Sequence, residues 1–382
     1  HTCSEVHPPR TKHRGGSKDV FLLQQCVSVC VVERKKGQTA QEESNQQTGG
    51  THTHTPTHTE KGIPSMSGSA PVVGLCVLLL LLMCAGGTCA HEEWPGTGSR
   101  DFGGNLPQGF SASGVLYHPR MQQLMVVSDN GQLAFMDIIS GLATDVWDLR
   151  PELGAEFSDL ECITVADPNT TFIYVCNEYP YKIFELDLAQ RNVTRRFDLS
   201  LALPPPKKTS RGIEAIAFIP NPQDEMEGGL FLVGSQSYGV IYQVEIPVRS
   251  SHTSTAVRLL GAFDPRPQTH DLSGLWYSPW TQRLYILYDT ASLLLSTSPD
   301  GSTVFDTWDL PKSTSNQEGV AVIGCGPESV IYMAQDNGSK FPKMSAWRYS
   351  IPTQQCVGSE AEFPLPDAAR EQGGVGWRLR GE

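Results

Sequence analysis

Residues 317–320 read Gln-Glu-Gly-Val and residues 272–275 read Leu-Ser-Gly-Leu, and these two stretches open copies of a block that recurs between residues 113 and 365. Each copy begins with a short, mostly apolar run that carries Ser or Glu at its second position. The five copies are led by Ser113, Glu161, Glu214, Ser273 and Glu318. A repeat of about 45 to 60 residues is typical of stacked supersecondary units rather than of one irregular core.

Further apolar runs follow in each copy. The second run ends in a polar residue, and these residues are Asp129, Glu178, Gln236, Asp289 and Asp336. A third run comes next, and three copies close on an aromatic-Asp-Leu stretch, at residues 147–149, 197–199 and 308–310. Short runs rich in β-branched and aromatic residues, separated by turn residues, predict four strands in each copy. The sequence therefore predicts an all-β fold, a β-propeller of five four-stranded blades, with six blades as the alternative.

The two ends of the chain differ from the repeated part. Residues 1–65 are expected to be an unstructured leader, and residues 52–59 read His-Thr-His-Thr-Pro-Thr-His-Thr. A translated CA-dinucleotide tract would give this run, so the leader is either untranslated sequence or a tract whose histidines His52, His54 and His58 bind metal. Residues 367–382 are polar and rich in Gly, which predicts a disordered tail after a propeller at residues 91–366.

Residues 66–90 resemble a signal peptide. The apolar run at 72–85 is too short to span a bilayer comfortably, and small residues follow it before His91. We therefore expect a secreted, extracellular protein. It would contact a membrane only if this segment remained uncleaved as an anchor.

Four cysteines follow the expected signal peptide, namely Cys162, Cys176, Cys325 and Cys356. An even count in an oxidising compartment predicts disulfides. A hairpin near residues 168–170 would bring Cys162 close to Cys176, which leaves Cys325 for Cys356; four buried thiols are the alternative. Asn169, Asn192 and Asn337 begin glycosylation sequons and fall at predicted turns or loops, so we expect a glycoprotein.

The charge balance excludes one class of partner. The chain holds 29 Lys and Arg against 41 Asp and Glu, a net charge of −12. Nucleic acid requires a basic surface, so we expect no nucleic-acid partner. An acidic protein of this kind suits cations instead.

Three of the five leading residues are glutamates in otherwise apolar strands. In a propeller the first strand of each blade lines the central axis, so Glu161, Glu214 and Glu318 would share one ring with Ser113 and Ser273. Carboxylates crowded in a narrow channel require either raised pKa values or a cation. Oxygen donors without His or Cys indicate Ca²⁺. The alternative is that the glutamates cap backbone amides between blades.

The polar residues that end the second strands form another candidate set near one mouth of the channel. Asp129, Glu178, Asp289 and Asp336, together with Gln236, could supply further oxygen ligands or hold a substrate. The alternative is that they hydrogen-bond their own turns.

Three phrases of the sequence resemble the SdiA-regulated domain family. They are residues 272–279 (Leu-Ser-Gly-Leu-Trp-Tyr-Ser-Pro), 283–289 (Arg-Leu-Tyr-Ile-Leu-Tyr-Asp) and 317–321 (Gln-Glu-Gly-Val-Ala). The resemblance implies a five-bladed propeller, similar to NHL-repeat propellers, with a calcium site. The family's Glu-Gly strand corresponds to Glu318 and Gly319, and less closely to Glu161 with Cys162 and Glu214 with Ala215.

The sequence leaves open whether the protein is an enzyme. One hypothesis is a calcium-stabilised extracellular module that binds another protein or a glycan through loops on one face. The other is a calcium-dependent hydrolase of phosphate esters or lactones, for which Lys182 and Arg211 are the candidate phosphate-binding cations. Fold alone does not decide between them.

Overall fold

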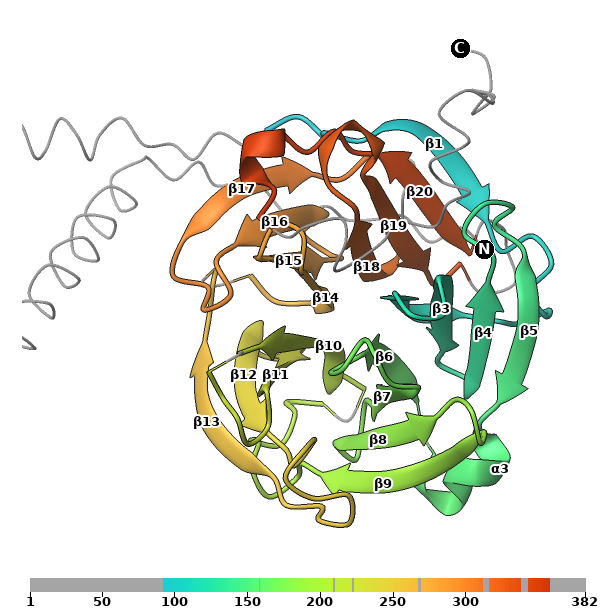
Figure 1. Cartoon of the computed structure of the whole chain (residues 1–382), viewed down its shortest axis with the longest axis vertical. Coiled ribbons are helices and arrows are strands. Elements are labelled where there is room, and N and C mark those ends of the chain that lie inside the picture. The colour runs from blue at the N-terminus through green and yellow to red at the C-terminus, as the bar shows by residue number, and fades with distance from the viewer. Residues whose placement is uncertain are drawn as a thin grey trace, which may run out of the picture. The chain divides into compact units, whose positions relative to one another are not determined.

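The computed structural model describes residues 92–357, except 158, 209, 222, 267–268, 312–315 and 338–342. The predicted leader, signal segment and tail lie outside the described residues. Within them, the repeated apolar runs form the strands of five separate four-stranded sheets. Figure 1 shows these sheets arranged around a common centre. The prediction of a five-bladed propeller is confirmed, and the six-bladed alternative is wrong.

Each sheet is one blade of antiparallel strands, and in blades 1 to 4 the strands follow chain order from the centre outward. Blade 1 consists of β2 (Ala112–His118), β3 (Gln123–Ser128), β4 (Gln132–Met136) and β5 (Ala143–Asp148). Blade 2 consists of β6 (Leu160–Thr164), β7 (Phe172–Asn177), β8 (Lys182–Asp187) and β9 (Asn192–Asp198). Blade 3 consists of β10 (Ile213–Pro220), β11 (Gly229–Ser235), β12 (Val240–Glu245) and β13 (Arg258–Phe263). Blade 4 consists of β14 (Leu272–Ser278), β15 (Arg283–Tyr288), β16 (Leu293–Thr297) and β17 (Val304–Asp309).

Blade 5 departs from the pattern, because its outer strand comes from the start of the propeller. Its inner strands are β18 (Gln317–Ile323), β19 (Val330–Gln335) and β20 (Met344–Arg348). Its fourth strand is β1 (Thr97–Phe102), which pairs with β20 so that Phe102 lies opposite Met344. The fifth copy of the repeat thus supplies three strands, and β1 closes the ring, as Figure 1 shows.

Helical structure is confined to short turns within the described ranges. They are α3 (Arg150–Leu153), η1 (Gly154–Glu156), η2 (Gly326–Glu328) and η3 (Thr353–Gln355). None of the helices in this part of the chain has the length and apolar character needed to cross a membrane.

The two predicted disulfides are confirmed. Cys162 and Cys176 lie directly opposite each other in β6 and β7, with their Cα atoms 5.1 Å apart. Cys325 and Cys356 are joined with a Cα separation of 5.9 Å, which ties the segment after η3 to the end of β18.

Two of the three sequons lie at turns or loops as predicted. Asn169 is exposed in the turn before β7, and Asn337 follows β19. Asn192 differs from the expectation, because it is the first residue of strand β9 rather than part of the preceding turn. Glycosylation itself stays a prediction.

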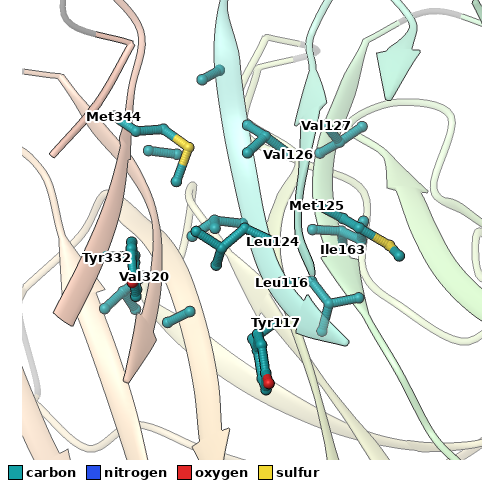
Figure 2. Close-up of a cluster of buried hydrophobic side chains, with 14 of the residues drawn as sticks. Leu116, Tyr117, Leu124, Met125, Val126, Val127, Ile163, Val320, Tyr332 and Met344 are labelled. Carbon is teal, nitrogen blue, oxygen red and sulfur yellow. The ribbon is translucent and has the colours of Figure 1, made fainter. Parts of the chain in front are cut away.

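The largest hydrophobic core lies between blades and holds them together. Figure 2 shows Val320, Tyr332 and Met344 of blade 5 opposite Leu116 and Leu124 of blade 1, and all five side chains are buried. Burying a side chain of this size contributes roughly 1.5 to 3 kcal/mol. Apolar residues in the inner strands therefore fix the spacing of the blades around the axis.

The innermost strands of blades 5 and 1 approach each other at backbone distance. A β-carbon placed on Gly319 would lie 2.9 Å from the backbone nitrogen of Val115 and 3.0 Å from Cα of Gly114. Real β-carbons essentially never come this close to rigid backbone. Glycine is therefore required where these two strands meet.

We expect Gly319→Ala to destabilise the protein by about 1 to 3 kcal/mol, because the added carbon would force two strands apart. Chemical denaturation measures the change. Gly261→Ala in β13 is the matched control, since its β-carbon would meet only the side-chain end of Gln243. Equal stability changes for the two variants would contradict the close packing at the axis.

Candidate metal centre at the propeller axis

A β-bulge occurs at the same place in the innermost strand of every blade. The register with the second strand shifts across one residue, and in the five blades this residue is Ser113, Glu161, Glu214, Ser273 or Glu318. A bulge leaves its extra residue outside the ladder and turns its side chain away from the regular direction. The five leading residues of the repeat therefore occupy equivalent backbone positions.

Four of these five residues line a small cavity. Its walls include residues Glu161, Glu214, Glu318 and Ser273, and the glycines Gly114, Gly274 and Gly319. The cavity volume is about 10 Å³, close to the space that a single water molecule requires. The axis is thus packed nearly solid, with room for one small ligand among three carboxyl groups.

Burial raises the pKa values of all three axial glutamates. The pKa of Glu161 lies well above its ordinary value because the carboxyl is buried and because Asp159 and Glu318 are nearby. The pKa of Glu214 is raised in the same way by burial, Glu161 and Glu318. For Glu318, burial followed by Asp289 and Asp336 raises the pKa to about 8. Without a bound cation these groups favour their neutral forms.

Two of the axial glutamates also hydrogen-bond to other carboxyl groups. Burial raises the pKa of Glu178, and a hydrogen bond donated by Glu214 partly offsets this rise. The same hydrogen bond adds to the raised pKa of Glu214. Glu161 donates a hydrogen bond to Asp159 in the same way, and this bond partly offsets the raised pKa of Asp159. A hydrogen bond between two carboxyl groups requires a proton on one of them. Each of these pairs therefore holds at least one proton while the bond is present.

The residues that end the second strands form a second ring with its own regularity. The backbone N–H of each donates to the carbonyl oxygen two residues before the bulge. These bonds join Asp129 to Ser111 (3.2 Å), Glu178 to Asp159 (2.8 Å), Gln236 to Gly212 (3.0 Å), Asp289 to Asp271 (3.1 Å) and Asp336 to Asn316 (2.9 Å). The ring therefore lies beside the start of the innermost strands, at one end of the axis.

Three side chains of this second ring reach the next blade. Glu178 Oε1 accepts a hydrogen bond from Gly212 N (3.1 Å), and Asp289 Oδ1 accepts one from Gln317 N (2.8 Å). Asp336 Oδ1 accepts one from Ser111 Oγ (2.5 Å), across the junction of blades 5 and 1. These carboxylates therefore join neighbouring blades. The sequence predicted either ligands for a metal or substrate, or hydrogen bonds within the residues' own turns. It did not predict hydrogen bonds between blades.

Sequence reasoning missed three charged residues near the axis. Asp159 and Asp271 stand two positions before the bulge, and the pKa of Asp159 rises to about 6 through burial, Asp129 and Glu178. Lys343 is buried, and Asp336 and Asp129 partly offset the lowering of its pKa by burial. A comparison of the position two residues before each leading residue would have found both aspartates. Lys343 had no signal in the repeat.

Residues 108–336 match the family model named SdiA-regulated. This match covers more than half of the chain and includes all five leading residues. The chain belongs to the SdiA-regulated family. A comparison with curated proteins found no match.

Among solved structures, this SdiA-regulated protein is similar to the glutaminyl cyclase of Myxococcus xanthus. The TM-score is 0.46 at 12% sequence identity, over 69% of this chain and 97% of that chain. A likeness at this level carries no information about function.

The donor set in this SdiA-regulated protein fits a hard cation. The axial groups are carboxyl oxygens, and the buried hydroxyl of Ser273 has no hydrogen-bond partner among the described residues. Calcium takes six to eight oxygen ligands of these kinds. Within the described ranges, no three His, Cys, Asp or Glu side chains are already arranged to hold a metal ion. Instead, Glu161 and Glu214 are hydrogen-bonded to other carboxyl groups.

The two cations considered for phosphate binding are placed unfavourably for that role. Lys182 Nζ lies 3.1 Å from Glu156 Oε1, so its charge is already paired. Arg211 is exposed, one residue before Gly212. Lys343 is instead the cation that interacts electrostatically with the carboxylates Asp129 and Asp336.

Proposed function

We propose that this SdiA-regulated protein is an extracellular binding module whose axial glutamates hold a calcium ion. The observation that carries the proposal is the placement of Glu161, Glu214 and Glu318 at equivalent bulges around one cavity of about 10 Å³. Their mutual repulsion and burial make the ionised forms costly unless a cation is present. Asp129, Glu178, Asp289 and Asp336 could supply further oxygens from the second ring.

A bound calcium ion would offset most of the charge of three ionised carboxylates at the axis and would join blades 2, 3 and 5. The protein would then present its loops on a rigid frame to an extracellular protein or glycan. Two disulfides fit an oxidising compartment of this kind.

The alternative, a calcium-dependent hydrolase of phosphate esters or lactones, has weaker support. Phosphate binding requires several cations near the metal, whereas in the described part of the chain the carboxylates near the axis outnumber Lys343, the cation that interacts with them. This charge balance favours a cation over a phosphate ester as the ligand. Hydrolysis assays on phosphate esters and lactones, with calcium and with EGTA, test the alternative directly.

We expect calcium to raise the melting temperature in a concentration-dependent manner. A ligand that binds only the folded state stabilises it by about 2.7 kcal/mol at 100 times its Kd. Differential scanning calorimetry in calcium and in EGTA measures the shift, and mass spectrometry of the metal content identifies the ion. Glu214→Gln should weaken the response to calcium.

Glu225→Gln is the control for this experiment. Glu225 is an exposed glutamate in the loop before β11, and its loss should leave the response to calcium unchanged. A wild-type protein that carries no metal and melts at one temperature in calcium and in EGTA would contradict the proposal.

A further inference from the structure

A second cavity lies at the opposite end of the innermost strands. Its volume is about 220 Å³, and its walls include Tyr117, Thr164, Phe218 and Trp276, near the ends of β2, β6, β10 and β14. These residues follow the bulged leading residues of their strands by three or four positions. At about 3.3 Å per residue, the cavity is roughly 10 to 13 Å from the ring of leading residues. It is therefore separate from the candidate metal centre.

The walls of this cavity are apolar and fixed in position. Trp276 Nε1 donates a hydrogen bond to the carbonyl oxygen of Val322 (2.8 Å), which holds the indole against blade 5. The rings of Tyr117 and Trp280 pack with their centroids 6.4 Å apart. All three side chains are buried and all three line the cavity. A preformed apolar cavity with few polar groups is the usual form of a small-molecule site.

One polar group on the wall has no partner. Tyr117 is completely buried, and its hydroxyl makes no hydrogen bond with any described residue. A buried hydroxyl without a hydrogen-bond partner has lost its hydration and gained nothing in return. Native structures therefore usually provide such a hydroxyl with a hydrogen-bond partner. The hydroxyl has no exposed surface, so a ligand in the cavity would satisfy it only after a small shift of the Tyr117 side chain.

The rim of the cavity carries an unpaired arginine. Arg249 is exposed, and its guanidinium makes no hydrogen bond or ion pair within the described part of the chain, although it lies against Gly228. A β-carbon on Gly228 would collide with that guanidinium, so the glycine provides its space. The backbone N–H of Arg249 donates to Glu227 Oε2 (3.0 Å), which anchors the residue beside the cavity.

The other charged groups at the rim are already engaged. Arg120 donates to the carbonyl oxygen of Asn169. Asp167 Oδ1 accepts from Asn169 N (3.0 Å), so this carboxylate holds its own turn together. Arg120 and Arg249 are matched in number by the carboxylates Asp167 and Glu227, so Arg249 differs from its neighbours by its unpaired guanidinium and not by a net positive charge of the rim.

We propose that this cavity binds an amphipathic organic anion, a carboxylate with a ring-shaped apolar body. The ring would lie among Tyr117, Trp276 and Trp280, and the guanidinium of Arg249 would bind the carboxylate, as planar guanidinium groups do. This site goes beyond the proposed calcium centre and does not depend on it.

Phenylacetate and phenylacetamide are suitable probes, because they share the ring and differ in charge. Binding is measured by tryptophan fluorescence and by calorimetry on protein made in a bacterial periplasm, where disulfides form and no glycan is added at Asn169 on the rim. We expect phenylacetate to bind at least tenfold more tightly than the amide, equally in calcium and in EGTA. No saturable binding, or equal binding of the two compounds, would overturn the proposal.

Two variants locate the binding. Arg249→Gln should remove the preference for the anion and leave binding of the amide, whereas Arg258→Gln, on the outer strand of the same blade, should change neither. Ala166→Leu should fill the cavity and abolish binding of both compounds, with an unchanged melting temperature as the check on folding. An unaltered preference in Arg249→Gln would exclude this site, whether or not Ala166→Leu folds.

Discussion

In EGTA, the free energy of unfolding should fall steadily as the pH rises from about 4.5 to about 8. Glu318 alone accounts for much of this fall, because burial followed by Asp289 and Asp336 raises its folded-state pKa to about 8. An acid with a raised folded-state pKa binds its proton more tightly in the folded protein, so its stabilising contribution is complete below the unfolded pKa. That contribution is lost as the pH rises, and the loss reaches on the order of 4 kcal/mol at pH 7.5.

Burial and neighbouring carboxylates act in the same direction on Glu161, Glu214 and Asp159. Denaturant titrations at several pH values, in EGTA, measure the effect. Glu318→Gln should flatten the pH dependence by up to about 1.4 kcal/mol per pH unit, the contribution of one proton. The same substitution at the exposed Glu328 should leave the slope unchanged.

Stability that is constant from pH 5 to pH 8 in EGTA would mean that the axial carboxyl groups are hydrated rather than buried. That result would count against the structure of the axis itself. Calcium should flatten the wild-type profile too, if the proposed site exists, because a cation favours the ionised carboxylates.

Arg195→Met should produce a destabilisation of similar size by a different cause. Arg195 in β9 and Glu185 in β8 form an ion pair whose side chains are 3% and 6% exposed. Glu185 also accepts hydrogen bonds from Tyr174 Oη (2.8 Å) and Thr194 Oγ1 (2.6 Å). Removing one partner of a buried pair leaves an unpaired charge and typically costs 3 to 5 kcal/mol.

Arg195 also connects two blades, which adds to the expected cost. Its guanidinium donates to the carbonyl oxygens of Pro247 and Ser251 (2.7 Å for the latter), in the segment between β12 and β13. The variant would leave these oxygens without that donor.

The exposed pair Arg258 and Glu245 provides the matched control. Their side chains are 67% and 28% exposed and their nearest atoms are 2.6 Å apart. Solvent screens exposed pairs and they contribute little to stability, so Arg258→Met should have little effect. The double variant Glu185→Leu with Arg195→Met should recover part of the lost stability, because it removes the unpaired charge. If Arg195→Met and Arg258→Met cost the same, the pair is not buried in solution.

The fold could be predicted from the sequence because the repeat is strong and its strands are short. Five leading residues at similar spacing fix the number of blades, and the hairpin between Cys162 and Cys176 fixes one disulfide. The closing strand could not be found in this way. Residues 97–102 contain few apolar side chains and are only partly buried, so β1 (Thr97–Phe102) lacks the pattern of an inner strand.

For the candidate site, the sequence predicted the ring of leading residues but not how the backbone places it. The repeat groups Glu161, Glu214 and Glu318, whereas the bulge at each position follows from strand pairing, which no single residue reveals. The blade-to-blade bonds of Asp289 and Asp336 were missed for a related reason. Gln317, the partner of Asp289, belongs to the next blade, and Ser111, the partner of Asp336, lies 225 residues away and comes close only when the ring closes.

The pairing of β1 with β20 has a consequence for how the protein is made. β1 leaves the ribosome before any complete blade exists, and its partner β20 is among the last strands to be synthesised. An unpaired strand edge can join the wrong neighbour, and pairing over long sequence distances is slow. β1 must therefore remain unpaired with other strands while four blades are synthesised. A chain that stops before β20 cannot form a closed ring, so cellular quality control should treat such truncated products as unfolded.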